Sequence, residues 1–225
     1  MAHLPPVSAE ELEELAPIIA MSEATMGFVP NSMKTMAHIR QLPAAFSVLF
    51  GTVMGTDTKV LLENMVKVVP KQNAPEDNLP ADLLQLVAYC VSLSAGCQYC
   101  QAHTGHNTQR MSAAPDAQAV KRSEVLRYDT AECFSDAEGA AIGVALAAGE
   151  VPNGATQSDF DVLKEHYTPR QITQIVAVIA AFGFLNRWND TMAIALEEEP
   201  IAFAEKNLAG NGWTVGKHVT GEAAE

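Results

Sequence analysis

The chain has 225 residues, of which 48% are hydrophobic and 18% charged, and its formal net charge is −13. This hydrophobic content is sufficient for a substantial core and excludes wholesale disorder. The acidity, together with the lack of any cluster of lysine and arginine, argues against a nucleic-acid partner, because phosphate binding needs clustered positive charge.

The first residues, MAHLPPVSAEELEELAP, contain no basic segment followed by an apolar run, so no secretory signal is expected. No stretch approaches the roughly 20 apolar residues that a membrane span needs. Four cysteines do not indicate a secreted scaffold built on disulfides. We therefore expect a cytoplasmic protein with no membrane partner.

Helical patterns dominate the N-terminal third. Ser8 followed by Glu11 is a capping-box pattern, which predicts a helix through AEELEELAPIIA. A break at Pro30 and two further helical stretches, PAAFSVLFGTVMG and DTKVLLENMVKVV, precede a loop over residues 70–80 that contains three prolines. These features predict an N-terminal helical segment over residues 1–70 that packs on a core formed by residues 71–225, the two making one compact domain overall.

The core should begin with a buried helix over residues 81–95, because ADLLQLVAYCVSLSA is apolar almost all round and is long for a strand. Gly96 permits a tight break before a second helix from Cys97 to Met111. No region shows two-residue alternation with hairpin turns, so the predicted fold class is all-α. Further helices are expected over residues 116–127, 135–149, 156–166, 169–187 and 197–209.

Two of these regions show a partial internal sequence similarity, which we call the echo. Shifted by 89 residues, LLQLVAYCVSLSAGCQYCQAH lies over ITQIVAVIAAFGFLNRWNDTM, which places Cys97 on Asn186 and Cys100 on Asn189. If the echo reflects a duplication, the chain contains two copies of a helical hairpin, and only the first copy retains thiols.

The segment AGCQYCQAHTGHN carries the chemistry. Cys97, Cys100, His103 and His106 follow one another in three-residue steps, which places neighbours on nearly one face of a helix, roughly 5–6 Å apart at Cβ. The two cysteines can therefore form a disulfide. Cys97 in the first helical turn would be favoured as a thiolate by unpaired N–H groups and the helix dipole, and His103 could accept the proton of Cys100.

Other interpretations of this segment stay open. Zinc accepts all four ligand types, although three-residue steps along one helix spread them over about 13 Å, too far for one ion. A purely structural pair is the second alternative, and a haem attachment is excluded because Gln101 follows Cys100. A redox-active dithiol is the favoured interpretation. No nucleotide-binding or serine-hydrolase motif is present, so no metal or cofactor is expected.

LVAYCVSLSAGCQYCQAHT resembles the core motif of the alkylhydroperoxidase AhpD-like proteins, within the carboxymuconolactone decarboxylase superfamily. FGFLNRWNDTMA and GNGWTVGKH are similar to a peroxidase-related branch, and with GFVPNSMKTMA the resemblance covers most of residues 26–218. It implies an all-α, usually homo-oligomeric protein. It also implies that the CxxC pair reduces hydroperoxides with electrons from a dithiol donor, such as a lipoyl group or a thioredoxin-like protein.

Carried onto this sequence, the resemblance makes Cys100 the thiolate that attacks the peroxide and Cys97 its resolving partner. The sulfenic acid formed on Cys100 would condense with Cys97 to a disulfide, which an external dithiol reduces. The helix-start argument instead favours Cys97 as the more acidic thiol, so the two lines of reasoning disagree.

The chain departs from the family pattern at two positions. Gln85 stands twelve residues before the first cysteine, where relay members carry glutamate, and Thr104 stands where the relay histidine commonly lies. Either His103, about 100° round the helix from that position, takes over the role, or the relay is absent. Tyr99 and His106 are candidate accessory residues, although space filling and a surface histidine are the simpler interpretations.

The predicted function is therefore that of a thiol-dependent peroxidase acting on small hydroperoxides. A carboxymuconolactone-decarboxylase-like enzyme is the alternative, although that chemistry would not need both thiols. A helical module whose disulfide senses redox state without catalysis is the third hypothesis.

Overall fold

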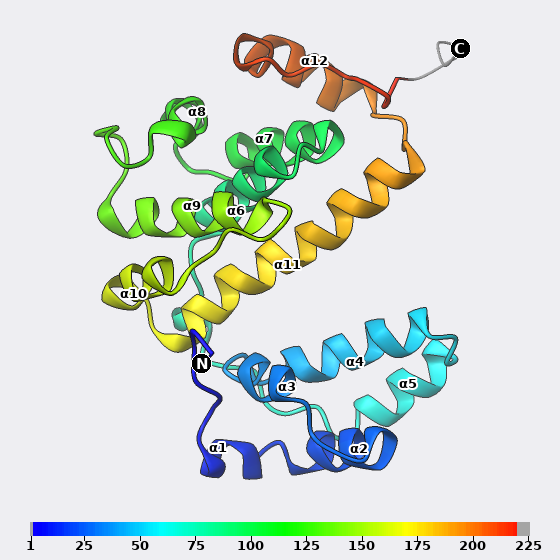
Figure 1. Cartoon of the computed structure of the whole chain (residues 1–225). Helices are drawn as coiled ribbons and strands as arrows, with labels where there is room; N and C mark the ends of the chain where they lie inside the picture. Colours follow the sequence, from blue (N-terminus) through cyan, green and yellow to red (C-terminus); the bar gives the residue numbers. More distant parts are fainter. Residues whose placement is uncertain (1, 220–225) are drawn as a thin grey trace. The chain divides into compact units, whose positions relative to one another are not determined.

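The computed structural model describes residues 2–219, and over this range it contains twelve α-helices, three short 3₁₀ helices and no strand (Figure 1). The all-α fold class predicted from the sequence is confirmed. Among these residues, no helix combines the length and the apolar character needed to cross a membrane.

The chain divides into two compact units. One contains the residues up to Asn78 together with Pro169–Thr173, and the other contains Leu79–Thr168 and the chain from Gln174 onward. All the thiols, and the histidines that follow the CxxC pair, belong to the second unit.

The first unit is built from short helices around small clusters of buried side chains. The predicted capping box is present, because Ser8 and Glu11 exchange hydrogen bonds. The single helix predicted behind it is wrong: Pro17, which has no N–H to donate, lies at the start of a second helix. The five α-helices are α1 (Ala9–Glu13), α2 (Ala16–Met26), α3 (Asn31–Met36), α4 (Leu42–Val53) and α5 (Thr58–Met65).

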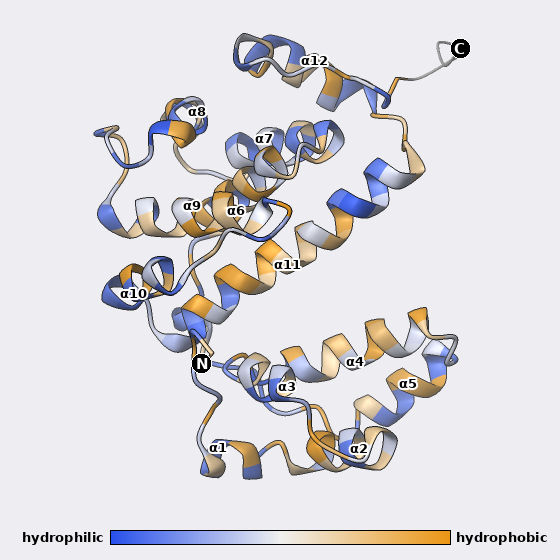
Figure 2. Cartoon of the chain, in the orientation of Figure 1, coloured by the Kyte–Doolittle hydropathy of each residue, from blue (hydrophilic) through white to orange (hydrophobic). Residues whose placement is uncertain are grey.

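The α4 helix carries hydrophobic residues along much of its length (Figure 2), yet several are exposed within this structure. Helix α4 contributes Ala44 to a buried cluster that also contains Ile18, Met33 and Met65. Phe50 and Val53 are more than half exposed. The first unit therefore presents apolar surface that its own core does not cover.

The second unit follows the predicted helices closely. Its α-helices are α6 (Ala81–Ser94), α7 (Gln98–Arg110), α8 (Pro115–Glu124), α9 (Asp136–Gly149), α10 (Gln157–His166), α11 (Pro169–Met192), whose first residues belong to the first unit, and α12 (Glu198–Asn207). Only α11 differs by more than a few residues, since it continues beyond the predicted end at residue 187.

Helix α6 is the centre of this unit, as its apolar sequence predicts. Its residues from Leu86 to Ser92 are all buried, and it packs against α7 and α9. The end of α9 approaches so closely that a Cβ on Gly149 would lie 2.7 Å from the Cβ of Ser94. Glycine is therefore required at the point where α9 meets the end of α6, just before the cysteine segment.

The chain reverses between α6 and α7 at Gly96, which has a left-handed φ of +73° that favours glycine. The corresponding stretch of α11 contains no such break, because Leu185 stands opposite Gly96 and the helix runs on to Met192. The duplicated hairpin is therefore not observed. The second region of the echo is one straight helix.

Candidate active site

The candidate site begins at the N-terminus of α7. Cys97 is the N-cap residue, and its Sγ accepts a hydrogen bond from the backbone N–H of Cys100 at 3.4 Å. A cap normally uses a side-chain oxygen, so here sulfur occupies the place of the usual hydroxyl or carboxylate. The thiol consequently lies at the positive end of the helix dipole, where a thiolate is stabilised.

The two thiols are buried, free and hydrogen-bonded to each other. The hydrogen bond from the Cys100 thiol is the largest influence on Cys97 and lowers its pKa, opposed by burial and by the negative charge of Asp190. The same hydrogen bond, together with burial, raises the pKa of Cys100. The reduced pair therefore favours a thiolate on Cys97 and a proton on Cys100.

Helix α11 supplies one amide to this pair and a second amide to the neighbouring Ser92. Asn189 Nδ2 donates to Cys100 Sγ at 3.4 Å, and Asn186 Oδ1 accepts a hydrogen bond from Ser92 Oγ at 3.1 Å. Asn189 is the residue that the echo aligns with Cys100. The two related segments therefore face each other within the second unit, and the amide of one binds the thiol of the other.

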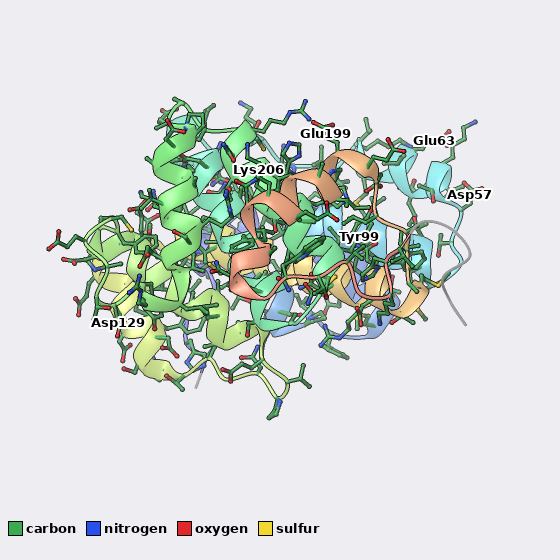
Figure 3. The ribbon with its side chains drawn as sticks, turned by 90° about the horizontal axis from the view of Figure 1, so that it is seen from above. Asp57, Glu63, Tyr99, Asp129, Glu199 and Lys206 are labelled. Carbon is green, nitrogen blue, oxygen red and sulfur yellow. The ribbon has the colours of Figure 1, made fainter. Side chains whose placement is uncertain are left out.

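A second group of side chains joins α7 to the start of α12, and it includes Tyr99, which is labelled in Figure 3. Glu197, the N-cap residue of α12, accepts a hydrogen bond from Tyr99 Oη at 3.0 Å and lies 2.7 Å from His103 Nε2. Partial burial opposes ionisation of Glu197, yet its own backbone N–H and these two side chains lower its pKa. Burial, followed by the bond to Glu197, raises the pKa of Tyr99 to about 12. His103 is therefore paired with a carboxylate.

A third group surrounds Cys97 from the C-terminal part of the chain. Cys97 Sγ, a carboxylate oxygen of Asp190 and a ring nitrogen of His218 all lie within 4.8 Å of one another. His218 is 1% exposed, and its Nδ1 lies 2.7 Å from the carbonyl oxygen of Ile194. Its Nε2 is buried without a hydrogen-bond partner, 3.6 Å from Asp190 Oδ1, while Lys217 Nζ lies 2.8 Å from the other carboxylate oxygen.

The Cys97 thiol, the Asp190 carboxylate and the His218 imidazole are also a donor set that zinc accepts. Within residues 2–219 this is the one group of three cysteine, histidine or carboxylate side chains whose donor atoms lie close enough to share an ion. It differs from the row of cysteines and histidines along α7 considered above for zinc. Lys217 already pairs with the carboxylate, so a positive charge lies beside the position that a cation would take.

Two of the predicted accessory residues are directed elsewhere. His106 Nε2 lies 3.6 Å from Glu199 Oε1, and its ring packs against Phe203 with 5.1 Å between the ring centres. The side-chain oxygen of Gln85 is buried without a hydrogen-bond partner. Across the described part of the chain, no hydrogen bond joins either residue to a cysteine.

A small cavity of about 200 Å³ opens beside the group around Cys97. It is lined by α6, the end of α9 and α11, and Asp190 belongs to both the cavity wall and the group around Cys97. Its apolar lining includes Val91, Val151 and Ile179, and its charged lining includes Glu150 and Arg187.

Comparison with known proteins gives matches among solved structures. The apo structure of the debrominase Bmp8 is 27% identical, with a TM-score of 0.54, and the match covers 90% of this chain and 96% of that one. A cysteine-to-alanine variant of Bmp8 in complex with 2,3,4-tribromopyrrole is 26% identical, covering 92% and 97%, also with a TM-score of 0.54. No family model matches the chain, and no curated protein matches it.

A crystal structure of an AhpD core, an uncharacterized peroxidase-related protein from Ralstonia eutropha JMP134, is 21% identical, covering 84% of this chain and 87% of that one, with a TM-score of 0.47. The chain is similar in fold to Bmp8 over most of both chains, and both likenesses accompany an all-α structure.

Neither of the two positions that depart from the pattern of AhpD-like proteins, Gln85 and Thr104, can act as a proton relay. The Thr104 hydroxyl donates to the carbonyl oxygen of Cys100 at 2.6 Å, so it is committed to the helix backbone. Gln85 carries an amide, which does not ionise. Proton transfer at the thiols therefore depends on other residues.

The residues that sequence reasoning missed are Glu197, Asp190 and His218. From sequence alone, Glu197 is interpreted as a solvated residue at a helix start. Its partners in the structure lie more than 90 positions earlier in the chain. His218 ends the segment GNGWTVGKH, whose similarity to the peroxidase-related branch was the one available signal.

Proposed function

We propose that the protein is a thiol-dependent peroxidase that reduces small hydroperoxides through a dithiol–disulfide cycle of Cys97 and Cys100. The observation that carries the proposal is the pair itself, two free thiols at the N-terminus of α7, where Cys97 is the N-cap residue and its sulfur accepts the backbone N–H of Cys100. A nucleophilic thiolate beside a protonated thiol is the arrangement that peroxide reduction followed by disulfide formation requires.

In the proposed cycle the Cys97 thiolate attacks one peroxide oxygen and breaks the O–O bond. The alkoxide takes up a proton and leaves as an alcohol, and Cys97 becomes a sulfenic acid. Cys100 then attacks the Cys97 sulfur, and hydroxide leaves as water with the proton of Cys100. A dithiol donor of lipoyl or thioredoxin type returns two electrons and two protons and restores both thiols.

The assignment of attack to Cys97 is supported by its N-cap position at the start of α7, where the helix dipole favours a thiolate, whereas the resemblance to AhpD-like proteins implies attack by Cys100. His103 remains a proposed proton carrier at the second group, where Glu197 orients its ring. The roughly 200 Å³ cavity has the size of a small organic molecule, and it reaches the group around Cys97 through Asp190, since neither cysteine lines it.

Rapid-mixing measurements with cumene hydroperoxide test this function. The wild-type protein should lose both thiols in a fast phase and yield a Cys97–Cys100 disulfide, identified by peptide mass spectrometry. Cys97→Ser should abolish the fast phase, and Cys100→Ser should stop at a sulfenic acid that dimedone traps. Cys133→Ser, which removes a thiol outside the pair, is the matched control.

The outcomes separate the alternatives. A fast phase lost only in Cys100→Ser would reverse the order of attack while preserving the peroxidase. If neither substitution slows peroxide consumption relative to Cys133→Ser, the peroxidase proposal is wrong.

Reductive dehalogenation is the second candidate, supported by the likeness to the debrominase Bmp8 over most of both chains. The same dithiol could transfer its two electrons to a bromoarene. The Cys97 thiolate would take the bromine, the ring carbon would take up a proton, and Cys100 would displace bromide to form the disulfide. Bromide release from 2,3,4-tribromopyrrole, measured by ion chromatography, distinguishes this activity from peroxide reduction.

We further propose that the protein is cytoplasmic and assembles as a homo-oligomer. A reducing compartment suits a thiol pair that must be returned to the dithiol state. Exposed apolar side chains such as Phe50 and Val53 on α4 support assembly, because large apolar patches mark interaction surfaces. Light scattering coupled to gel filtration tests the assembly, and a monomer at all concentrations would refute it.

A further inference from the structure

His218 has the position and the hydrogen bonds of a proton acceptor for Cys97. Its Nδ1 lies 2.7 Å from the Ile194 carbonyl oxygen, and a carbonyl can only accept a hydrogen bond. Nδ1 therefore carries the proton, and in the neutral ring Nε2 holds a free lone pair. That nitrogen is buried without a hydrogen-bond partner, although a buried polar atom normally has one.

The backbone of His218 is held in place by two hydrogen bonds. The His218 N–H donates to the Val215 carbonyl at 3.1 Å, and its carbonyl accepts from the Leu196 N–H at 2.9 Å. These two bonds fix the backbone of the residue, and the contact of Nδ1 with the Ile194 carbonyl oxygen orients the ring. Such fixed orientation is what a proton-transfer residue needs, because transfer requires a defined acceptor direction.

We propose that His218 accepts the proton of the Cys97 thiol and that Asp190 stabilises the imidazolium that forms, so that the three residues act as a Cys–His–Asp relay. This proposal deepens the proposed function and rests on it, since it assigns the proton pathway that Gln85 and Thr104 cannot provide. No other cysteine, histidine or carboxylate side chain of residues 2–219 is placed with Asp190 and Cys97 in this way.

The relay also supplies the proton that peroxide cleavage consumes. The thiol proton moves to His218 Nε2 and leaves a thiolate. When that thiolate breaks the O–O bond, the imidazolium returns the proton to the departing alkoxide, which leaves as an alcohol. One proton is thus taken from sulfur and delivered to oxygen, and the ring is neutral again at the end of the step.

The charges around the ring are consistent with this role. Asp190 Oδ1 lies 3.6 Å from Nε2, and Lys217 on the far side of that carboxylate lies 2.8 Å from Oδ2. Cys97, the N-cap residue of α7, and the ring of Tyr99, 5.6 Å away between ring centres, lie against the same histidine. Asp190 is therefore the anionic side chain next to the ring, and it opposes a thiolate on Cys97 unless a cation lies between them.

Alkylation of Cys97 by iodoacetamide tests the relay without using peroxide. The rate is followed by peptide mass spectrometry across pH, on the reduced full-length chain in the presence of a chelator. In His218→Gln the rate at about pH 6.5 should fall about tenfold, because without the acceptor the thiol ionises roughly one unit higher. Above about pH 10, where most thiols are ionised anyway, the two proteins should react at similar rates.

The shape of this profile separates a relay from a structural role. A histidine that only supports packing would change access to Cys97 at every pH. His166→Gln, which removes an exposed imidazole from α10, is the matched control and should follow the wild type. Profiles of His218→Gln and wild type that superimpose would overturn the proposal, even if peroxide reduction is confirmed.

Nuclear magnetic resonance supplies a second test that does not depend on the stability of the histidine variant. Long-range ¹⁵N–¹H spectra report the protonation of each ring nitrogen of His218. In Cys97→Ser, the Nε2 resonance of His218 should shift relative to the wild type at the same pH, because the relay places this nitrogen next to the Cys97 sulfur. An Nε2 resonance that is unchanged by the substitution would contradict the relay.

Discussion

The break between α6 and α7 and the matching stretch of α11 show how one sequence pattern gives two different structures. In the first region Gly96 adopts a left-handed φ, the chain reverses, and a new helix begins with Cys97 as its cap. In the second, Leu185 replaces the glycine and the helix continues, so Asn186 and Asn189 lie within it.

This difference in backbone structure explains why a thiol with a lowered pKa can occur in the first region and not in the second. A helix start offers unpaired N–H groups, and Cys97 uses one of them. Residues within a helix have no such free donors, so side chains there can act only through their own groups. Asn189 does this by donating its amide to Cys100. The continuous helix has therefore become the support for the interrupted one.

The largest effect should come from removing the break. Gly96→Ala forces a side chain into a left-handed conformation and should cost about 1–2 kcal/mol of unfolding free energy. It should also slow alkylation of Cys97 below neutral pH, because the helix start is displaced. Denaturant unfolding and iodoacetamide labelling measure the two effects.

Gly210→Ala is the matched control for that substitution, because a Cβ at Gly210 meets nothing within 4 Å and its φ lies outside the left-handed region. The control should change stability by less than about 0.5 kcal/mol. Equal losses in the two variants would show that the conformation of Gly96 contributes nothing.

The break itself could be predicted from sequence because its cause is local. Glycine after a long apolar segment indicates a helix end, and the boundaries of α6 and α7 agree with the prediction to within a residue or two. The duplicated hairpin was a wrong prediction because the alignment matched apolar residues and ignored the one position that turns the chain. Leucine is favourable in a helix interior, so the helix continues through Leu185.

The candidate site was less predictable because its partners are distant in sequence. Cys97 and Cys100 lie in one motif, whereas Glu197, Asp190 and His218 reach the motif only through the packing of α11, α12 and the segment after them. Single-sequence patterns report neighbours along a helix and do not report which helix packs on it. The sequence could therefore identify the thiols and their family resemblance, while the carboxylate partner of His103 required the structure.

A substitution in α11 tests the comparison from the other side, with a smaller expected effect. Leu185→Gly should reduce unfolding free energy by about 1 kcal/mol relative to Leu185→Ala, because glycine is less favourable in a helix interior. The helix should nevertheless remain continuous, since neighbouring side chains such as Ile179 remain packed. Far-ultraviolet circular dichroism and denaturant unfolding of both variants check this; a loss of helical signal specific to the glycine variant would show that glycine alone creates the break.

The smallest expected effect concerns the amide that α11 contributes to the thiol pair. Asn189 lowers the pKa of Cys100 against the larger effects that raise it, so Asn189→Ala should leave Cys100 still more reluctant to ionise. Disulfide formation after peroxide attack should slow by about threefold, which corresponds to the loss of a weak hydrogen bond.

Asn186→Ala, which removes the bond to Ser92 instead, should reduce stability without slowing that step. Quenched-flow mass spectrometry measures disulfide formation in both variants, and equal slowing would mean that α11 acts on the pair only through packing, because a direct amide–thiol bond exists at Asn189 alone of these two positions.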